Sequence, residues 1–441
     1  MFLKTLAKAA LTRFPDDGRW VKRMYHHMIQ ANRYRTVRRR QQRGSWRLPP
    51  QDHVLWLSPD RIRLHTNLRT NGAPPKPADR VFGLSSKIQV AGGDWDLGGI
   101  DFEELEAFKS IKAHMTEGTE WRQTGFYREI LADIEAGTPQ WGCHNAADLD
   151  RRCEYIDSVI ASVRRYGLLA HKDVGPAQDA TGGFSDEIEV NVGRDGEFLF
   201  QDGRHRLAIA KILGLTRIPV KIRVRHLEWQ KFREYLFSMA EHGGATSDGA
   251  LYQSPVHPDL NDIPAAHVCE DRLAFLLPHV QIHQGRLLDI GCNLAFFCHH
   301  FEQAGLDCTG IELDPETAHV ARRIARSEHR RFRILSGDVL SPEIHDPLLA
   351  QPYNVVLALN VLHHFMKTKE DYERLRIFLK KLQPRQMLFE PHRTDESQMQ
   401  GVYANLSERD FVAFVQENAG LPHAEHIHTA SDGRMIFSLH H

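Results

Sequence analysis

The sequence has little of what marks disulfide-rich, metal-binding and membrane-spanning proteins. Its 441 residues include only 6 cysteines, and none of these forms a C-x-x-C pair, which argues against a zinc ribbon and a disulfide scaffold. No apolar run approaches the ~20 residues needed to cross a bilayer, and no apolar core with a small-residue cleavage site indicates a signal peptide. We therefore expect a cytoplasmic protein in a reducing compartment.

The chain also lacks an excess of either charge. Its 56 Lys and Arg residues balance 57 Asp and Glu residues, which leaves a net charge of -1 and no global attraction for nucleic acid. The 27 histidines form no H-E-x-x-H set that would indicate a metal site. The balance fails locally, because residues 1–43 hold 12 Lys or Arg but only two acids. This basic stretch could contact an anionic membrane surface, or it could be a solvated, partly disordered segment.

Changes in residue pattern divide the chain into four predicted parts. Residues 1–45 are basic and have a helical pattern, so they predict a helical arm. Residues 46–241 mix strand-like and helical patterns and predict an α+β domain. Residues 242–264 begin with the Gly-rich stretch "HGGATSDGA" and predict a linker. Residues 265–441 predict a separate α/β domain.

Two patterns in the α+β domain predict specific elements. In "CEYIDSVIASVRRYGLL", Ile156, Val159, Ile160 and Val163 share one face of a helix, and Gly167 follows as a stop signal. Further on, "EIEVNV" and "EFLF" alternate in polarity on either side of "GRDG". This arrangement predicts a β-hairpin with an Asp-Gly turn.

The C-terminal domain is predicted from a series of short buried strands that alternate with helical segments. The strands are "RLLDIG", "CTGIELD", "FRILSGD", "YNVVLALNVL" and "RQMLFEP". Strands that alternate with helices in this way predict a parallel sheet. The last segment, "HAEHIHTASDGRMIFSLHH", predicts a hairpin that completes the sheet.

The most informative stretch is the turn after the first of these strands, which reads "DIGCNLA" from Asp289. Gly291 lets the backbone approach a ligand closely, and Asn293 tolerates a positive φ angle. About 20 residues further on, the next strand ends at Glu312, whose carboxylate can accept both hydroxyls of a ribose. Ligands of doubly wound sheets bind at such turns.

These residues resemble the class I S-adenosylmethionine-dependent methyltransferases over about residues 265–441. The family's first motif is acid-x-Gly-x-Gly-x-Gly, and Asn and Ala replace its second and third glycines here. The resemblance implies a Rossmann-like domain with seven strands and S-adenosylmethionine as cofactor. It also implies that Asp289 and Gly291 lie near the methionine part, Glu312 at the ribose and Asp338 at the adenine.

Four residues after the fourth and fifth strands are candidates for contacting the methyl acceptor. His363 and His364 follow the fourth strand, and Glu390 and His392 follow the fifth. A hydroxyl or amine acceptor would require a base, whereas a phosphate would not; each histidine could also have only a packing role. An N/D-P-P-Y motif is missing, which disfavours methylation of an amide or a nucleobase amine of that type.

A second strand–turn–helix pattern, "EFLFQDGRHRLAIAKILGLTRIPVKI", lies in the N-terminal half. Its turn comprises Asp202, Gly203, Arg204, His205 and Arg206. The start of a helix with two arginines suits a phosphate group, because free N–H groups, the helix dipole and the guanidinium forks all attract it. The Asp202 carboxylate should stay ionised among these cations, available to Mg²⁺ or as a base. A turn that only stabilises its own helix is the alternative.

This stretch resembles the ParB/sulfiredoxin family over about residues 185–225. The family shares a D/E-G-x-(H/R)-R-x-x-A helix start followed by an "IPV" strand, and it uses the turn to bind the phosphates of a nucleotide such as CTP or ATP. Arg204 occupies the position of the sulfiredoxin cysteine, and no helix-turn-helix DNA reader follows. A kinase-like use remains, in which Asp202 acts with Glu187 or Glu189 on metal and acceptor.

Together the two halves suggest a bifunctional kinase–methyltransferase. Such an enzyme would phosphorylate an acceptor with ATP and Mg²⁺ and then methylate the phosphate. The pairing is similar in architecture to the kinase–methyltransferase chain terminators of bacterial O-antigen polysaccharides, although the protein-kinase motifs G-x-G-x-x-G, V-A-I-K and H-R-D are missing. This similarity implies a glycan or small-molecule acceptor and an enzyme peripheral to the inner membrane.

Two other functions remain open at this stage. The N-terminal half could only recognise the substrate of a small-molecule or protein methyltransferase. It could instead be a nucleotide-gated binding module with a regulatory methyltransferase attached. Near-zero net charge and the missing DNA-reading helix pair count against a nucleic-acid partner. The sequence does not indicate an oligomeric state.

Overall fold

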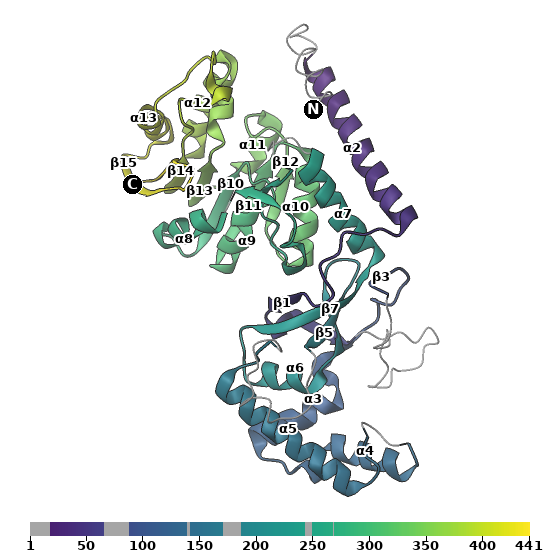
Figure 1. Cartoon of the computed structure of the whole chain (residues 1–441). Helices are drawn as coiled ribbons and strands as arrows, with labels where there is room; N and C mark the ends of the chain where they lie inside the picture. The colour runs from purple at the N-terminus through teal and green to yellow at the C-terminus, as the bar shows by residue number, and fades with distance from the viewer. Residues whose placement is uncertain (1–17, 66–87, 139–141, 171–186, 243–248, 268) are drawn as a thin grey trace. The chain divides into compact units, whose positions relative to one another are not determined.

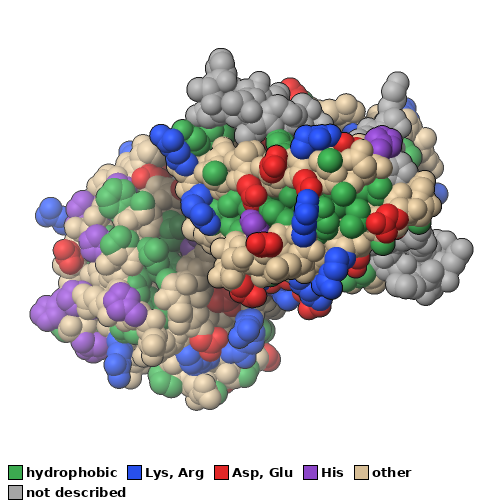
Figure 2. All heavy atoms as spheres, turned by 90° about the horizontal axis from the view of Figure 1, so that it is seen from below, with side chains coloured by type: hydrophobic (Ala, Val, Ile, Leu, Met, Phe, Trp, Pro, Cys, Tyr) green, Lys and Arg blue, Asp and Glu red, His purple; other side chains and the backbone are tan. Residues whose placement is uncertain are grey.

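The computed structural model describes residues 18–65, 88–138, 142–170, 187–242, 249–267 and 269–441 (Figure 1). The chain divides into two compact units, which we call the N-terminal unit (residues 30–235) and the C-terminal unit (residues 236–441, grouped with residues 1–29). Among the described helices, none has both the length and the apolar character that a membrane crossing requires. Acidic and basic side chains are interspersed on the face shown in Figure 2, in keeping with the net charge of -1.

Parts of three predicted segments lie outside the described residues. They are residues 1–17 of the basic arm, residues 185–186 at the start of the ParB-like stretch and residues 243–248 of the linker.

The N-terminal unit contains a seven-stranded mixed sheet with the strand order β1-β7-β5-β6-β2-β4 and with β3 paired to β7. The strands are β1 (Val54–Leu57), β2 (Ile62–His65), β3 (Val90–Ala91), β4 (Ile100–Asp101), β5 (Ile188–Val192), β6 (Phe198–Asp202) and β7 (Ile218–His226). Strands β5 and β6 are antiparallel, which confirms the predicted hairpin, and β7 runs parallel to β5. A sheet of this mixed kind is not a parallel α/β sheet.

Helices accompany this sheet and extend beyond it. They are α2 (Gly18–Arg43), α3 (Glu106–Glu117), α4 (Gly125–Glu135), α5 (Ala146–Tyr166), α6 (Arg204–Ile212) and α7 (Leu227–His242), with short 3-10 turns at Pro59–Arg61, Phe102–Glu104 and Trp121–Gln123. Helix α5 buries Ile156, Val159, Ile160 and Val163, as its periodicity predicts, and it ends at Gly167 with a φ of 72°. Helices α2 and α7 each cross the boundary between the two units.

The C-terminal unit is built on a second seven-stranded sheet, with the order β12-β11-β10-β13-β14-β16-β15. Its strands are β10 (Gly285–Ile290), β11 (Leu306–Glu312), β12 (Arg333–Ser336), β13 (Val355–Leu359), β14 (Gln386–Glu390), β15 (His423–Thr429) and β16 (Met435–His440). The first five of these strands are parallel, and the predicted terminal hairpin adds antiparallel to β14. The order reverses between β10 and β13, and ligands of such sheets bind beside that point. The predicted Rossmann-like fold is confirmed.

Helices cover both faces of this sheet (Figure 1). They are α8 (Cys269–His279), α9 (Phe296–Gln303), α10 (Pro315–Ser327), α11 (Pro342–Leu348), α12 (Lys369–Leu382) and α13 (Glu408–Ala419), with 3-10 turns at Pro258–Leu260, Leu362–Met366 and Ser397–Met399. Successive strand residues pack into two hydrophobic layers, one on each face of the sheet. Leu288 and Val356 belong to one layer, and Leu287 and Val355 belong to the other. Burial on both faces explains why these strands have apolar runs in the sequence.

Residues 249–267 differ from the linker predicted over 242–264. They form two short parallel strands, β8 (Leu251–Gln253) and β9 (Ala265–His267). Leu251, Leu260 and Ile263 are buried, so the segment packs as part of the C-terminal unit. The polar, Gly-rich composition that suggested a linker is confined to the residues just before it. We call residues 249–267 the strap.

Candidate functional site

The turn between β10 and α9 has the open backbone that a close-fitting ligand requires. Gly291 has a φ of 72°, and a Cβ atom there would lie 2.7 Å from Cγ2 of Val361. Asn293 and Ala295 also have left-handed backbones, with φ of 50° and 62°. These two residues therefore adopt the conformation for which the family uses glycine, at the cost of some backbone strain. The Asn293 side-chain oxygen is buried and has no hydrogen-bond partner among the described residues, so it is available to a ligand.

Glu312, at the end of β11, lies beside this turn. Its Oε2 atom accepts a hydrogen bond from the backbone N–H of Asn293 at 2.9 Å, and its Oε1 atom accepts one from Asp314 at 2.9 Å. Each carboxylate oxygen keeps a second lone pair for a ligand hydroxyl. Burial raises the pKa of Glu312, while the two backbone N–H groups favour the charged form.

Asp289 lies beneath the turn and is only 2% exposed. Its Oδ2 atom accepts a weak hydrogen bond from the Cys298 thiol at 3.6 Å. Burial, with a smaller contribution from the charge of Glu312, raises the pKa of Asp289 to about 7. This carboxyl therefore titrates near neutral pH.

Asp338, predicted at the adenine, follows β12 and is bound by the protein itself. Its Oδ1 atom accepts from the backbone N–H of Leu340 at 2.9 Å, and its Oδ2 atom pairs with Arg374 at 2.7 Å. An adenine amine would have to share this carboxylate with Arg374. Asp338 and Glu312 follow neighbouring strands, since β11 and β12 pair in parallel.

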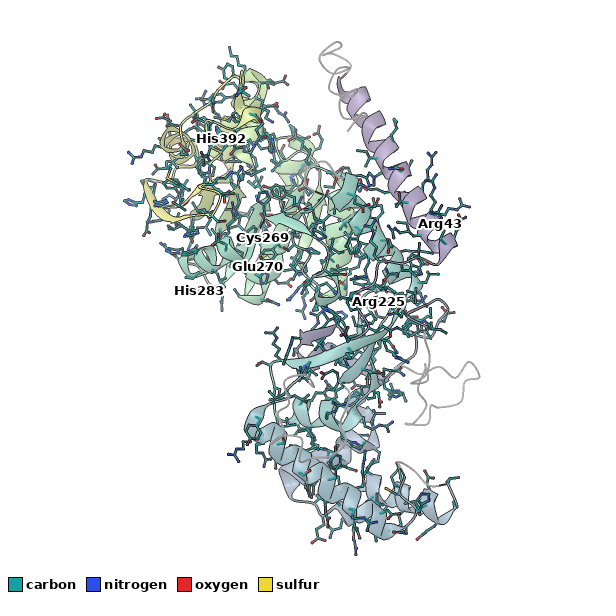
Figure 3. All side chains as sticks on the ribbon, in the orientation of Figure 1. Arg43, Arg225, Cys269, Glu270, His283 and His392 are labelled. Carbon is teal, nitrogen blue, oxygen red and sulfur yellow. The ribbon has the colours of Figure 1, made fainter. Side chains whose placement is uncertain are left out.

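His363, His364 and His392 gather after β13 and β14. The ring centroids of His363 and His364 are 4.1 Å apart, and those of His363 and His392 are 5.6 Å apart. Burial and the neighbouring histidines lower the pKa of His363 to about 3, and burial with Lys367 lowers that of His364 to about 4. His392 is fully buried, and its Nε2 atom lies 3.0 Å from the side-chain oxygen of Asn405 (Figure 3). His363 and His364 are therefore neutral at pH 7 and are weak bases.

Glu390, the last residue of β14, is neutralised by an ion-pair network. Arg272 binds it through two contacts of 2.7 and 3.2 Å. Arg272 also pairs with Asp432 at 2.8 Å, and Asp432 pairs with Arg434 at 2.8 Å. Because both oxygens of Glu390 are bound by a guanidinium, this carboxylate is a poor candidate for a base.

In the N-terminal unit, the predicted basic turn connects β6 to α6. Gly203 has a φ of 91°, and a Cβ atom there would lie 3.1 Å from the Cα atom of Ile188. Arg204, His205 and Arg206 form the first turn of α6, as the sequence predicts. The backbone N–H groups at this helix start have no intrahelical acceptor.

Arg152 on α5 also contributes positive charge to this turn. Burial, followed by the charges of Arg152, Arg204 and Arg206, lowers the pKa of His205 to about 3. Three arginines thus act on one buried imidazole at this turn. The sequence analysis missed Arg152 because α5 lies about 50 residues before the turn.

The predicted carboxylates lie on the hairpin beside this turn. Glu189 on β5 and Asp202 on β6 are register partners, and directly opposed residues of antiparallel strands point to the same face. Glu187 directly precedes β5 and is 2% exposed. No group of three His, Cys, Asp or Glu side chains suited to a metal occurs among the described residues, so Asp202 as a Mg²⁺ ligand stays a prediction.

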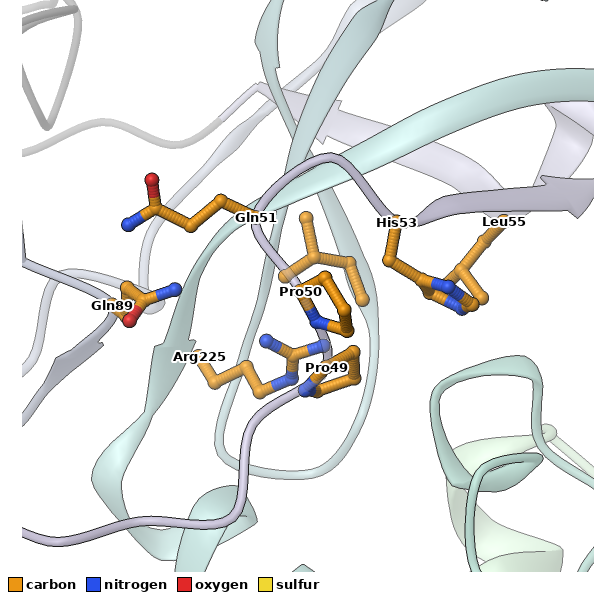
Figure 4. Close-up of a pocket in the computed structure, with 8 residues that line it drawn as sticks. Pro49, Pro50, Gln51, His53, Leu55, Gln89 and Arg225 are labelled. Carbon is orange, nitrogen blue, oxygen red and sulfur yellow. The ribbon is translucent and has the colours of Figure 1, made fainter.

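A small pocket in the N-terminal unit is separate from these residues (Figure 4). It is lined by Pro49, Pro50, Gln51, His53, Leu55, Gln89, Ile222 and Arg225. None of the predicted site residues contributes to it, and we assign no function to it.

One comparison with known proteins matches part of the C-terminal unit. Residues 288–384 match the model of the family described as "Methyltransferase domain". No curated protein matches the sequence of this chain.

Comparison with solved structures finds similar folds over less than half of the chain. Crystal structures of WbdD, one of which is described as a bifunctional kinase-methyltransferase, have a TM-score of 0.36 and 19% identity. They cover 43% of this chain, which spans 44% of theirs. PH0226 from Pyrococcus horikoshii OT3 has a TM-score of 0.30 and 12% identity, and covers 40% of this chain and 92% of its own. The methyltransferase domain of bacterial CtHen1 has a TM-score of 0.32 and 10% identity, and covers 40% of this chain and 100% of its own.

The family match falls on β10 to α12, the part of the sheet that carries Gly291, Glu312 and Asp338. We conclude that the C-terminal unit of this chain contains a methyltransferase domain over residues 288–384.

Proposed function

We propose that the C-terminal unit binds S-adenosylmethionine at the β10–α9 turn and methylates an acceptor beside β13 and β14. The observation that carries this proposal is the contact between Glu312 and the N–H of Asn293, which fixes a carboxylate beside an open turn. When bound, S-adenosylmethionine supplies an activated methyl group. The protein's own residues would hold its ribose through Glu312, accept a hydrogen bond at Asn293 and leave room at Gly291.

The groups near the acceptor support an anionic acceptor. His363 and His364 have pKa values near 3 and 4, so they accept protons weakly at pH 7. Glu390 is paired with Arg272. An acceptor that must lose a proton would find no strong base among these groups, whereas a phosphate monoester needs none. We therefore propose methylation of a phosphate.

The basic turn of the N-terminal unit supports a second activity. Arg152, Arg204 and Arg206 surround it, and Glu189 and Asp202 lie side by side on the adjacent strands. We propose that this turn binds the phosphates of ATP, with Asp202, Glu187 or Glu189 acting on Mg²⁺ or on an acceptor hydroxyl. The acceptor hydroxyl would lose its proton to one of these carboxylates and gain the terminal phosphoryl group of ATP, with ADP as the leaving group. An oxygen of the new monoester would then gain the methyl group, with release of S-adenosylhomocysteine.

Capping of a bacterial surface glycan is one use of this sequence of reactions. A methyl phosphate blocks the hydroxyl at which a polysaccharide would otherwise grow. The alternative is a methyltransferase whose N-terminal unit only recognises the substrate.

Calorimetric titration of the purified chain tests both activities separately. We expect binding of S-adenosylmethionine, and binding of ATP with Mg²⁺ that is lost in Arg206→Ala. If the protein binds S-adenosylmethionine but no nucleotide, the kinase proposal fails and the methyltransferase proposal stands. Preference for CTP over ATP would favour a nucleotide-gated module instead.

Helix α2 offers a surface for an anionic membrane. On one side of the helix, Arg33 and Val37 are buried. The guanidinium carbon of Arg33 lies 6.0 Å from the ring centroid of Tyr235. Arg40 on the same side pairs with the buried Glu234 at 3.3 Å. The helix contains no acidic residue.

The other side of α2 exposes Arg35, Arg38, Arg39 and Arg43. Figure 3 labels Arg43 at the end of this helix. No ion pair reaches these four from the residues that the structure describes. We propose that this basic face binds anionic lipid, since each such charge adds about 1 kcal/mol near a lipid surface. In sedimentation with phosphatidylserine vesicles, the wild type should pellet with the vesicles, whereas the double variant Arg38→Glu/Arg39→Glu should stay in the supernatant. Equal binding of both proteins would contradict the proposal.

A further inference from the structure

The strap brings a tyrosine to the point where the strand order of the C-terminal sheet reverses. We infer that Tyr252 is a substrate-contacting residue whose hydroxyl donates a hydrogen bond to an oxyanion of the methyl acceptor, with Asn360 holding that hydroxyl in place. The inference rests on the proposed methyltransferase function and deepens it. It adds a binding group from outside the matched residues 288–384.

The strap is attached to the domain at two further points. The Gln253 side-chain oxygen accepts a hydrogen bond from the backbone N–H of Phe296 at 3.4 Å, directly after the cofactor turn. His257 is 1% exposed, and its Nε2 atom lies 3.8 Å from a carboxylate oxygen of Glu328 at the end of α10. The strap therefore has a defined position beside the carboxyl ends of the strands.

Tyr252 and Asn360 meet at the end of β13. The Asn360 amide nitrogen donates a hydrogen bond to the Tyr252 hydroxyl oxygen at 3.2 Å. Asn360 has a left-handed backbone, with a φ of 51°, and its neighbour Val361 contacts Gly291 closely. The pair thus lies between the cofactor turn and the histidines, where a methyl group and its acceptor would meet.

Both side chains retain hydrogen-bonding capacity. The Tyr252 hydroxyl accepts from Asn360, so its own proton can be donated elsewhere. The Asn360 side-chain oxygen is buried and has no hydrogen-bond partner among the described residues. If the amide were rotated by 180°, its oxygen would accept the Tyr252 proton, and the Asn360 amide nitrogen would then be the donor left for an oxyanion. A ligand is the natural partner for such groups.

The surroundings favour an oxyanion as that ligand. Burial raises the pKa of Tyr252, so the hydroxyl keeps its proton and acts as a donor. The charges of Arg434, Glu390 and Arg272 also act on this hydroxyl, and Glu390 and Arg272 are paired with each other. The His267 ring lies 4.3 Å from the Tyr252 ring, and burial lowers the pKa of this imidazole. A protonated hydroxyl with a free donor position suits a phosphate or carboxylate oxygen.

Calorimetry with simple anions tests the inference. Full-length protein carrying Arg206→Ala, which weakens the other proposed phosphate site, is saturated with S-adenosylhomocysteine and titrated with phenyl phosphate. Adding Tyr252→Phe should weaken phenyl phosphate binding about tenfold, the effect of one hydrogen bond to a charged group. Affinity for S-adenosylhomocysteine should change less than about twofold. Asn360→Asp should weaken phenyl phosphate binding further, because the new charge repels the anion.

Tyr353→Phe is the matched control. Tyr353 lies in the same unit just before β13 and is 2% exposed, and its hydroxyl has no hydrogen-bond partner among the described residues. This variant should bind phenyl phosphate as the parent does. If acetate also binds and Tyr252→Phe weakens its binding to the same extent, the contact with Tyr252 is supported. The oxyanion of the acceptor could then be supplied by a carboxylate.

Unchanged phenyl phosphate binding in Tyr252→Phe would overturn the inference. So would a parent protein that binds S-adenosylhomocysteine but no phenyl phosphate, and the methyltransferase proposal would then survive. Failure to bind S-adenosylhomocysteine would remove the proposed function itself.

Discussion

Each unit contains a strand, a left-handed glycine and a helix, but the two turns differ in their charged side chains. In the C-terminal unit, β10 leads through Gly291 to α9, with Asp289 and Glu312 nearby and no Lys or Arg in residues 289–312. In the N-terminal unit, β6 leads through Gly203 to α6, and arginines surround the turn. The same backbone arrangement therefore serves two kinds of ligand.

The charge decides which ligand each turn suits. Carboxylates repel a phosphate but accept hydrogen bonds from ribose hydroxyls and tolerate a positively charged sulfonium. Arginines attract a phosphate and repel a sulfonium. Fold alone would not distinguish the two turns, because helix starts attract anions generally. Tests that separate the two ligands are therefore the ones that matter.

Replacement of either glycine should have the largest effect. In Gly291→Ala the new Cβ would lie 2.7 Å from Val361 in a backbone that disfavours alanine, so S-adenosylmethionine affinity should fall roughly 100-fold. Gly203→Ala should instead reduce ATP affinity, because its Cβ would press on the Ile188 backbone. Calorimetry with both ligands measures the separation. Loss of both ligands in either variant would mean that the turns are not independent.

Neutralising the carboxylate beside the C-terminal turn should have the next largest effect. Glu312→Gln keeps the side-chain shape but removes the charge that would bind two ribose hydroxyls. We expect S-adenosylmethionine affinity to fall by ~10- to 100-fold, with ATP affinity unchanged. Glu316→Gln, on the first turn of α10, is a control that leaves the carboxylate at the turn intact. Normal affinity in Glu312→Gln would remove the ribose assignment.

Removing the arginine that the sequence analysis missed tests the positive turn. Arg152→Ala should reduce ATP affinity about tenfold, as one charge-assisted contact would. It should also raise the pKa of His205, since the charge of Arg152 helps to lower it. Titration of the His205 ring by NMR measures this shift, and Arg151→Ala provides a neighbouring exposed control. An unchanged His205 pKa would show that Arg152 does not act on the turn.

The smallest expected effect is on stability and concerns Asp289. Its folded-state pKa is raised to about 7, so the folded protein holds this proton more tightly than the unfolded chain does. The stabilisation is present below pH 4 and is lost as pH rises through 7. Asp289→Asn should therefore increase the free energy of unfolding, and with it the melting temperature, more at pH 8 than at pH 5, by up to a few kcal/mol at most. Melting curves at both pH values measure it; an equal shift at both would contradict the raised pKa.

The sequence allowed the C-terminal sheet and its cofactor turn to be predicted because their signals are local. Buried strands leave apolar runs, and Asn293 was expected to tolerate the positive φ that it adopts. The strap was missed because β8 and β9 are three residues each, too short for a periodic pattern. Tyr252 meets Asn360 across 108 positions, and no pattern in the chain pairs such distant residues.

The N-terminal half was less predictable for a related reason. Its hairpin and the turn at Gly203 follow from adjacent residues, and both are found. The mixed sheet joins β2 to β6 and β1 to β7, which lie far apart in sequence. Strand order of this kind depends on tertiary packing rather than on local preference.

The ion-pair network around Glu390 also bears on how the C-terminal unit is made. Arg272 comes from the first helix after the strap, whereas Asp432 and Arg434 come from the final hairpin. During synthesis, Arg272 would leave the ribosome long before two of the residues that complete its network. Contacts between such distant residues slow folding, because a long loop must close first. The acceptor side of the site is thus the part that a truncated chain would fail to assemble.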